Sequence, residues 1–431
     1  MRKKDSLFCG AFTLALGGFV TKIIGAIYRI PLTNILGSEG IGIYQMVFPL
    51  YCLLLTVSST GVPNGIAKLI AEGNDAEVTL KSALKIFVPI GLLGSAIMMV
   101  FSNKIASLQG NSLATVSYIY IAPSVLAVSI ISCFRGYYQG FLSMNPTAIS
   151  QVLEQVVKLS FGLTLAFVFR KNTAVSASMA ALSVTISEVV TVFYLCFIKK
   201  RKGGFNFLKV STNNYKKIIK TVVPITFSTI IMPLTRTVES FIIFNILNKY
   251  LNNATSLYGL YSGAVESLVS VPVSILYSIA VTSVPLISRE SGNKYIKTKK
   301  PLILTLIGSV IFAVGFYLCS SLFVKILYRR LSYEDTLVAI KMAKMASLSV
   351  LTLPLMQTFN ACLIACGHIF VPSLTSLTAS VIKIILSIFL LNIKSVNIFA
   401  VIITDIICYL VACLLNLVYI IRNNKYKLVE S

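Results

Sequence analysis

Long uninterrupted apolar stretches constrain this sequence more than any other feature. About a dozen runs of roughly 17–30 residues follow one another along the chain. A run of ~18 or more apolar residues can cross the ~30 Å hydrocarbon core of a bilayer as an α-helix. The predicted fold is therefore an all-α polytopic membrane protein with about 12 transmembrane helices. The predicted spans are 7–28, 42–59, 86–102, 116–134, 147–168, 175–198, 221–247, 257–287, 302–327, 343–364, 371–393 and 398–421.

The composition agrees with a membrane protein. Apolar residues make up 56% of the 431 residues, charged residues only 12%, and the mean hydropathy is +0.85. A soluble domain carries about 25% charged residues. A net charge of +24 also fits a nucleic-acid-binding protein, but the basic residues stand at the ends of apolar runs and not along one folded face. We therefore expect membrane lipids, and no nucleic acid, as partners.

The distribution of Lys and Arg predicts the orientation, because cytoplasmic loops carry an excess of these residues. With the N-terminus in the cytoplasm, 23 of the 38 basic residues fall on the cytoplasmic side and nine on the other side. The sequence thus predicts a multi-pass membrane protein with both termini cytoplasmic.

A basic loop divides the spans into two groups of six. Lys and Arg are concentrated at 199–220, between the sixth and seventh spans. We predict an N-terminal six-helix lobe at 1–202, a basic cytoplasmic linker at 203–220 and a C-terminal six-helix lobe at 221–431. Spans of equal orientation in the two lobes would form a parallel repeat, which places a substrate site between them.

No motif for catalysis or a bound cofactor is present in the sequence. It contains no P-loop, no His-Glu-x-x-His and no nucleophile elbow. Cys362, Cys366 and His368 have the spacing of metal ligands, but no fourth ligand is near them in the sequence. We predict that the protein is not an enzyme and has no cofactor or metal, and that an Na⁺ or H⁺ gradient, or the substrate's own gradient, drives any transport.

Charged residues inside the predicted spans are the candidates for function, because each costs ~2.5–3.5 kcal/mol at the centre of a membrane helix unless it faces a partner or water. They are Lys22, Glu154, Lys158, Glu188, Arg236, Glu239, Glu266, Lys383 and Asp405. Lys22 and Arg236 belong to the first helix of each lobe, where two cations facing a central cavity would bind a pyrophosphate. Glu188, Glu266 and Asp405 are candidates for binding Na⁺ or a proton.

Two same-helix pairs leave an alternative open. Glu154 and Lys158 are four residues apart, and Arg236 and Glu239 are three apart, so each pair shares one helix face. These charges either neutralise one another as structural salt bridges or take part in ion coupling.

Three stretches resemble the stage V sporulation protein B group of polysaccharide and lipid-linked oligosaccharide exporters, within the multidrug/oligosaccharidyl-lipid/polysaccharide superfamily. The first runs from Lys22-Ile-Ile-Gly-Ala-Ile-Tyr-Arg through Gly-Ser-Glu-Gly-Ile-Gly-Ile-Tyr-Gln to Gly-Val-Pro-Asn-Gly-Ile-Ala-Lys68. The second is Phe-Arg-Gly-Tyr-Tyr-Gln-Gly at 134–140, followed by Asn-Pro-Thr-Ala-Ile-Ser-Gln at 145–151. The third covers 257–288.

This resemblance implies a V-shaped transporter of two lobes, similar to multidrug antiporters and lipid flippases. The implied activity is outward movement of an undecaprenyl-pyrophosphate-linked saccharide, namely the peptidoglycan precursor lipid II, by alternating access. Lys22 matches a basic position in the first helix of related flippases. Their next arginine falls on Tyr28, with Arg29 adjacent, so Arg29 joins Lys22 and Arg236 as a predicted substrate-binding residue.

Two other functions remain open at this level. A multidrug/cation antiporter has the same architecture, although its cationic substrates favour an acidic cavity. A non-transporting scaffold would recruit cell-wall synthesis enzymes through the basic loop. The lipid-linked oligosaccharide is the expected substrate and partner in the first interpretation, and cell-wall synthesis enzymes are the expected partners in the last.

Overall fold

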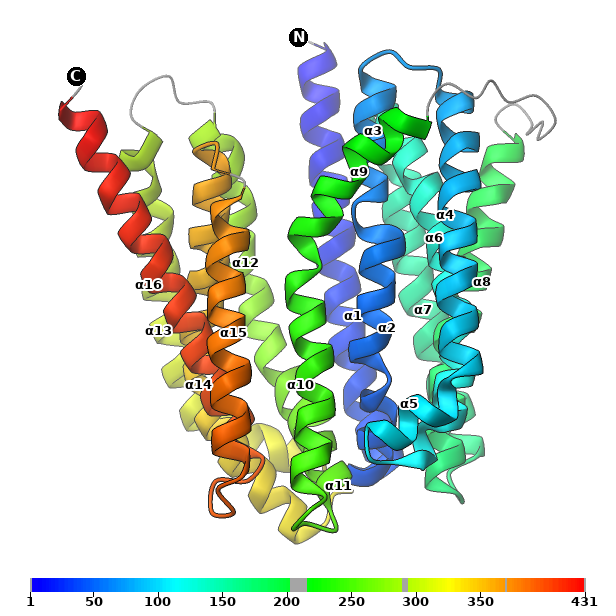
Figure 1. Ribbon diagram of the computed structural model, residues 1–431, viewed down its shortest axis with the longest axis vertical. Coiled ribbons are helices and arrows are strands. Elements are labelled where there is room, and N and C mark those ends of the chain that lie inside the picture. Colours follow the sequence, from blue (N-terminus) through cyan, green and yellow to red (C-terminus); the bar gives the residue numbers. More distant parts are fainter. Residues whose placement is uncertain (1, 202–214, 289–293, 369, 430–431) are drawn as a thin grey trace. The chain divides into compact units, whose positions relative to one another are not determined.

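The computed structural model describes residues 2–201, 215–288, 294–368 and 370–429, and within these ranges the side chains other than those of 2–16, 19, 22, 228, 285 and 424–429. The chain forms two compact units, unit 1 (Met1–Thr237) and unit 2 (Val238–Ser431). All regular structure within the described ranges is helical, as the apolar runs predict. Figure 1 shows these helices, coloured along the sequence.

Unit 1 contains α1 (Arg2–Met46), α2 (Phe48–Leu55), η1 (Thr56–Thr60), α3 (Val62–Ala71), α4 (Ala76–Val100), α5 (Ser102–Leu108), η2 (Ser112–Ala114), α6 (Thr115–Gly140), α7 (Asn145–Val168), α8 (Thr173–Arg201), α9 (Tyr215–Thr229) and the beginning of α10 (Ile231–Leu247). Unit 2 contains the rest of α10, followed by α11 (Ala254–Tyr258), η3 (Gly259–Val265), α12 (Glu266–Ser288), α13 (Lys294–Leu327), α14 (Tyr333–Ala365), α15 (Val371–Leu391) and α16 (Phe399–Val429).

The number of membrane spans follows from helix length and hydropathy. Ten helical stretches in the described residues are long and apolar enough to cross a bilayer, and the bent pair α9 and α10 makes an eleventh. The first stretch, Ile23–Ala71, has 49 residues and would be ~74 Å long at 1.5 Å per residue. This length is more than twice the hydrocarbon thickness. The chain turns at Gly37, whose φ of 68° interrupts α1, and Figure 1 shows α2 returning beside α1. This one stretch therefore contains the whole of the second predicted span, 42–59, and only the end of the first, 7–28.

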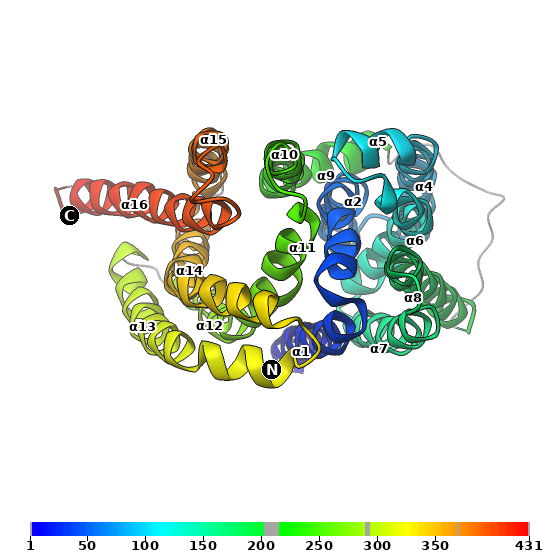
Figure 2. The ribbon, with the colours of Figure 1, turned by 90° about the horizontal axis from the view of Figure 1, so that it is seen from below.

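Helix α6 occupies the centre of unit 1, in contact with α4 and α8 (Figure 2). Its apolar side chains Tyr118, Ile121, Val125 and Ile131 are buried. A Cβ on Gly136 would lie 2.8 Å from Cβ of Ile66 on α3, which is closer than packed carbon atoms approach. Glycine at this position therefore permits the close contact of α3 with α6.

The boundary between the two units differs from the predicted linker at 203–220. A Cβ on Gly65 of α3 would lie 2.5 Å from Cγ2 of Val222, so α9 packs closely on α3. The hydroxyl of Thr237, near the beginning of α10, donates a hydrogen bond to the carbonyl of Pro49 at 2.9 Å. These contacts attach residues 215–237 to unit 1. The boundary between the units therefore lies after Thr237, later in the chain than the predicted start of the second lobe at 221. Residues 203–214 of the predicted linker lie outside the described ranges.

Large apolar side chains cover the outer surfaces of the helices in both units. Leu318 on α13 is 71% exposed and Phe389 on α15 is 67% exposed, and many other Leu, Ile, Val and Phe residues are similarly exposed. Lipid acyl chains are a favourable environment for such a surface, whereas water is not. Together with the spanning helices, this surface identifies a multi-pass membrane protein.

Candidate functional site

A buried ionic group of three charged side chains lies inside unit 2. The ammonium of Lys383 on α15 contacts Oε2 of Glu239 on α10 at 2.5 Å and Oδ1 of Asp405 on α16 at 2.7 Å. The three side chains are between 5% and 11% exposed. Lysine donates through three N–H groups and carboxylates only accept, so one cation joins two anions from different helices. We call Glu239, Lys383 and Asp405 the buried triad.

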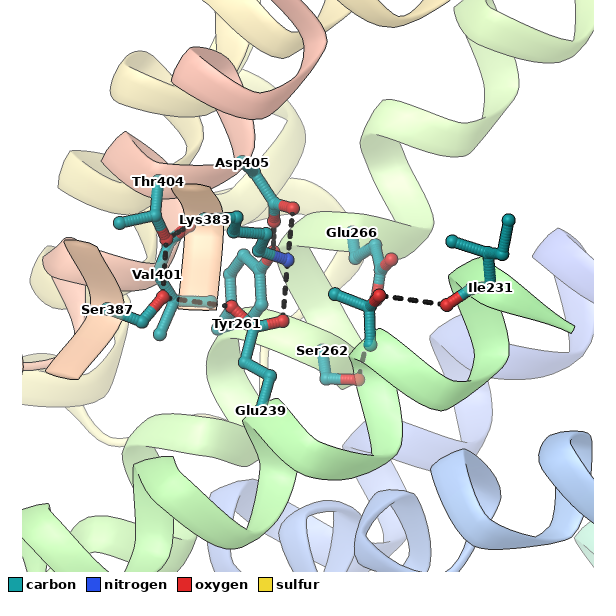
Figure 3. Close-up of polar contacts among 11 residues, drawn as sticks. Ile231, Glu239, Tyr261, Ser262, Glu266, Lys383, Ser387, Val401, Thr404 and Asp405 are labelled. Carbon is teal, nitrogen blue, oxygen red and sulfur yellow. Dashed lines mark hydrogen bonds and ion pairs between the residues drawn. The ribbon is translucent and has the colours of Figure 1, made fainter. Parts of the chain in front are cut away.

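Three hydroxyl groups complete the surroundings of the buried triad (Figure 3). Tyr261 donates to Oδ2 of Asp405, and Ser387 lies 3.5 Å from Oε1 of Glu239. The hydroxyl of Ser387 also bonds to that of Thr404 at 3.1 Å. Burial of ionised groups is tolerated only when their hydrogen-bonding capacity is satisfied. Tyr261 and Ser387 lie against the carboxylate oxygens that Lys383 does not contact, and Thr404 contacts Ser387.

Local sequence explains how these side chains come to face one another. Lys383 and Ser387 are four residues apart on α15 and share one helix face. Tyr261 belongs to η3, a π-helical segment with the glycine-rich sequence Gly-Leu-Tyr-Ser-Gly-Ala-Val. π-Helical turns add a residue to the helical repeat and frequently mark functional sites.

Glu266 follows η3 at the beginning of α12 and is separate from the buried triad. Its side chain is partly buried, and Ser262 donates to its Oε2 at 3.4 Å. Figure 3 shows Glu266 beside Ser262, with Lys383 directed at the other two carboxylates. Of the predicted ion-coupling residues of unit 2, Glu239 and Asp405 therefore share one cation, and Glu266 has its own surroundings.

Unit 1 contains a second ionic group, formed by α6 and α7. Arg135 contacts Oε2 of Glu154 at 3.1 Å and donates from Nε to Ser150 at 2.9 Å. The sequence predicted Lys158 as the helix-sharing partner of Glu154, and the predicted span 116–134 ended one residue before Arg135. The structure places Arg135 inside α6, where it forms an ion pair with Glu154, while Lys158 remains within electrostatic range of that carboxylate.

Glu188 on α8 lies close to this group. It is 5% exposed, and its Oε2 is buried without a hydrogen bond from any described residue. The charges of Glu154, Arg135 and Lys158 act on it. Arg29, on α1, is partly buried and also acts electrostatically on Lys158. The structure thus brings the predicted residues Glu154, Lys158, Glu188 and Arg29 into one neighbourhood and adds Arg135, which sequence reasoning missed.

The two other predicted substrate-binding residues have different outcomes. Lys22 lies in α1, but its side chain is outside the described part of the structure. Arg236 lies on α10 with an exposed side chain. On the same helix, Glu239 is buried and bonded to Lys383. Glu239 thus has an ion-pair partner on another helix, α15, in addition to any interaction within α10.

The Cys-x-x-x-Cys-x-His segment has a structural explanation in unit 2. Nε2 of His368 is 2.6 Å from the hydroxyl of Tyr295, and Nδ1 is 3.1 Å from the hydroxyl of Tyr419. Both ring nitrogens are therefore engaged by phenols from α13 and α16. Within the ranges that the structure describes, no three His, Cys, Asp or Glu side chains are grouped to hold a metal ion.

Comparison with known proteins assigns the family. A sequence model described as "Polysaccharide biosynthesis protein" matches residues 7–291, which include unit 1 and the first part of unit 2. The chain belongs to this family. The resemblance to the stage V sporulation protein B group, noted in the three sequence stretches, is confirmed by a relative of that name.

Two curated relatives of this family member come from Bacillus subtilis (strain 168). Stage V sporulation protein B is 30% identical over 309 residues, covering 68% of this chain and 60% of that protein. Lipid II flippase MurJ is 27% identical over 327 residues, covering 67% of this chain and 59% of that protein. The matches therefore span about six tenths of the length of these relatives. Neither the family nor these relatives are enzymes by description, as the sequence predicted.

Solved structures share the fold over nearly the whole chain. An inward-facing multidrug resistance MATE family transporter of the MOP superfamily has a TM-score of 0.77 at 12% identity, covering 95% of this chain and 96% of that one. Lipid II flippase MurJ in its inward closed conformation has a TM-score of 0.75 at 15% identity, covering 94% and 87%. At such low identity the likeness establishes the fold alone. The predicted fold class, that of MATE transporters and lipid flippases, is confirmed.

Sequence reasoning noted Lys383 as a charge within a span but assigned it no role in substrate binding or ion coupling. Its partners come from helices far away along the chain, since 144 residues separate it from Glu239 and 22 from Asp405. A lone lysine in an apolar run was a usable signal, because such a charge requires a buried anion. The supporting hydroxyl groups of Tyr261, Ser387 and Thr404 gave no signal, since Ser, Thr and Tyr are common throughout the spans.

Proposed function

We propose that this chain is a flippase that moves an undecaprenyl-pyrophosphate-linked saccharide from the cytoplasmic to the outer leaflet of the bacterial plasma membrane. The observation that carries the proposal is membership of the polysaccharide biosynthesis protein family, with a relative named as a lipid II flippase that matches 67% of the chain. Lipid II is the substrate that this relative's name favours. The termini are proposed to be cytoplasmic because of the distribution of Lys and Arg.

Basic side chains within apolar helices support an anionic head group. Arg29 and Lys158 belong to the same charged neighbourhood of unit 1, and Arg135 is held there by Glu154. A cation within a membrane helix is costly unless it has a functional partner. Pyrophosphate is a strong partner, because charge-assisted hydrogen bonds to phosphate exceed neutral ones in strength.

We assign the pyrophosphate to Lys22, Arg29 and Arg236, with Arg29 and Arg236 offering bidentate contacts. The polyprenyl tail stays among the lipids, where the exposed apolar helix surfaces are compatible with it. The carboxylates Glu188 and Glu266 are left to bind a coupling ion or to form resting salt bridges. Movement of the head group across the membrane then follows by alternating access.

Reconstitution tests the proposal directly. Purified protein is placed in liposomes with a fluorescent polyprenyl-pyrophosphoryl disaccharide, and protection of its head group from a membrane-impermeant quencher is followed with and without an ion gradient. Arg29→Gln and Arg236→Gln should each slow flipping by roughly 10–100-fold, the value of one charge-assisted hydrogen bond of ~1.5–3 kcal/mol. The matched control is Arg170→Gln, since Arg170 is an exposed residue that stacks on Phe167.

A second candidate is a multidrug/cation antiporter, because the fold of this chain is also that of a MATE transporter and fold alone does not separate the two functions. The same liposomes distinguish the two functions when a fluorescent organic cation replaces the lipid. Removal of positive charge at Arg29 or Arg236 should leave cation export intact or increase it, because like charges repel. Export of the organic cation by the wild type without any lipid flipping would reject the flippase proposal, whereas lipid flipping that is unchanged in both variants would reject the pyrophosphate-binding role of Arg29 and Arg236. If neither substrate moves, the chain is better described as a scaffold for cell-wall synthesis enzymes.

A further inference from the structure

The oxygen atoms around Lys383 form a site that a free cation could otherwise occupy. Two carboxylates from α10 and α16 direct one oxygen each at the ammonium, at 2.5 and 2.7 Å. The remaining oxygens of Glu239 and Asp405 face Ser387 and Tyr261 (Figure 3). All three charged side chains are nearly or fully buried among apolar helices. Such a group of oxygens is the kind of environment that hard cations select.

Two buried carboxylates require a cation in this position. Removing charged groups from water is costly, and an unpaired buried anion either takes up a proton or binds a cation. Here the cation is the ammonium group of Lys383, which is covalently part of α15. The buried triad has two negative groups and one positive group, so it remains acidic even with the lysine in place.

We propose that Lys383 is a built-in cation that takes the place of an exchangeable Na⁺ between Glu239 and Asp405. A free ion can enter and leave this site during a transport cycle, whereas the lysine ammonium cannot leave. Glu239 and Asp405, predicted from the sequence as ion-coupling candidates, therefore hold the helices of unit 2 together and do not exchange Na⁺. Any Na⁺ coupling must use other carboxylates.

The consequence for coupling rests on the proposed flippase activity, but the site itself does not. Cation binding is measured on the purified protein without any lipid substrate. Failure of the flipping assay would therefore leave the cation experiment unaffected, and the reverse also holds.

The experiment measures thermal unfolding and ²²Na⁺ binding of detergent-solubilised protein. NaCl or methylammonium chloride is exchanged for choline chloride at constant ionic strength, because choline is too large for the site. The proteins compared are the wild type, Lys383→Ala, and Lys383→Ala combined with Glu239→Gln and Asp405→Asn. Lys344→Ala is the matched control, since Lys344 is an exposed lysine of α14 in the same unit.

The wild type and the Lys344→Ala control should unfold at the same temperature in Na⁺ and in choline. Lys383→Ala should unfold at a lower temperature in choline and show a saturable rise of a few degrees with Na⁺ or methylammonium, as expected for a ligand that binds the folded state. The triple variant should lose this response, because its carboxylates are replaced by amides.

Two results would overturn the proposal. One is saturable ²²Na⁺ binding in the wild type that disappears in Asp405→Asn. The other is a folded Lys383→Ala protein that responds to neither cation. If Lys383→Ala yields no folded protein, the comparison of ²²Na⁺ binding between the wild type and Asp405→Asn decides alone. Equal binding in the two proteins supports the proposal that Lys383 is a built-in cation. Binding that is lost in Asp405→Asn refutes the proposal.

Discussion

Replacing Lys383 by Met should destabilise unit 2 far more than replacing either of its partners by an amide. The variant keeps the side-chain volume but leaves Glu239 and Asp405 facing one another across the position of the ammonium. Oxygens at 2.5 and 2.7 Å from one nitrogen lie at most about 5 Å apart. Two like charges at this distance repel by ~3 kcal/mol at an effective dielectric constant of 20. Removing one partner of a buried ion pair typically lowers the free energy of unfolding by ~3–5 kcal/mol.

The charge of the buried triad gives the expected order of the variants. Lys383→Met leaves two unpaired anions, whereas Glu239→Gln leaves the neutral pair of Lys383 with Asp405. The amide variant should therefore lose much less stability. A variant with Glu239→Gln, Lys383→Met and Asp405→Asn together should recover most of the loss, because no uncompensated charge remains in it.

Thiol-reactive dye fluorescence is a suitable assay, since the sequence contains no Trp. The free cysteines Cys362 and Cys408 are buried in unit 2 and become reactive when it unfolds. A loss of ~3–5 kcal/mol corresponds to a fall of roughly 10 °C in the midpoint for a domain of this size. Lys344→Met, on the exposed face of α14, is the control. An unfolding midpoint of Lys383→Met within 1 °C of wild type would refute the electrostatic reasoning.

Three further predictions concern other contacts. Gly136→Leu should disrupt the contact between α6 and α3, because even a Cβ at this position would lie 2.8 Å from Ile66; the expected cost is ~1–3 kcal/mol, and equal midpoints for variant and wild type would contradict it. His368→Phe should lower stability by ~1–3 kcal/mol, because two phenol hydroxyl groups lose their ring-nitrogen partners; dye reactivity of Cys366 near this ring should rise at lower temperature. Arg135→Met should be more damaging than Arg135→Met combined with Glu154→Gln, since the single change removes the ion-pair partner of Glu154 and keeps its charge. A double variant less stable than the single one would show that the ion pair does not govern this contact.

Several features of the protein could be predicted from its sequence because they depend on local properties. A helix that crosses a bilayer satisfies its own backbone hydrogen bonds, so length and hydropathy alone identify it. The same reasoning identified Glu154, Glu188, Glu239 and Asp405 as unusual, since each interrupts an apolar run. Family resemblance in three stretches of the sequence added the fold.

The partner of each buried charge could not be predicted in this way. Glu154 is four residues from Lys158, yet its ion pair is with Arg135 on the neighbouring helix α6. The position of the unit boundary is likewise set by packing and not by the basic loop. The contact of Gly65 with Val222 attaches α9 to unit 1, so the boundary lies after Thr237. The partner of a buried charge and the position of the unit boundary both depend on which helix faces pack against one another. Helix packing is determined by residues throughout the chain.

The sequence by itself therefore determined that this chain crosses a membrane many times and carries charges where lipids disfavour them. Only the tertiary structure decided that Lys383 neutralises Glu239 and Asp405, because helix packing brings together side chains that are 144 and 22 residues apart. An apolar environment makes an unpaired charge too costly to retain, but the position of its partner is set by the fold.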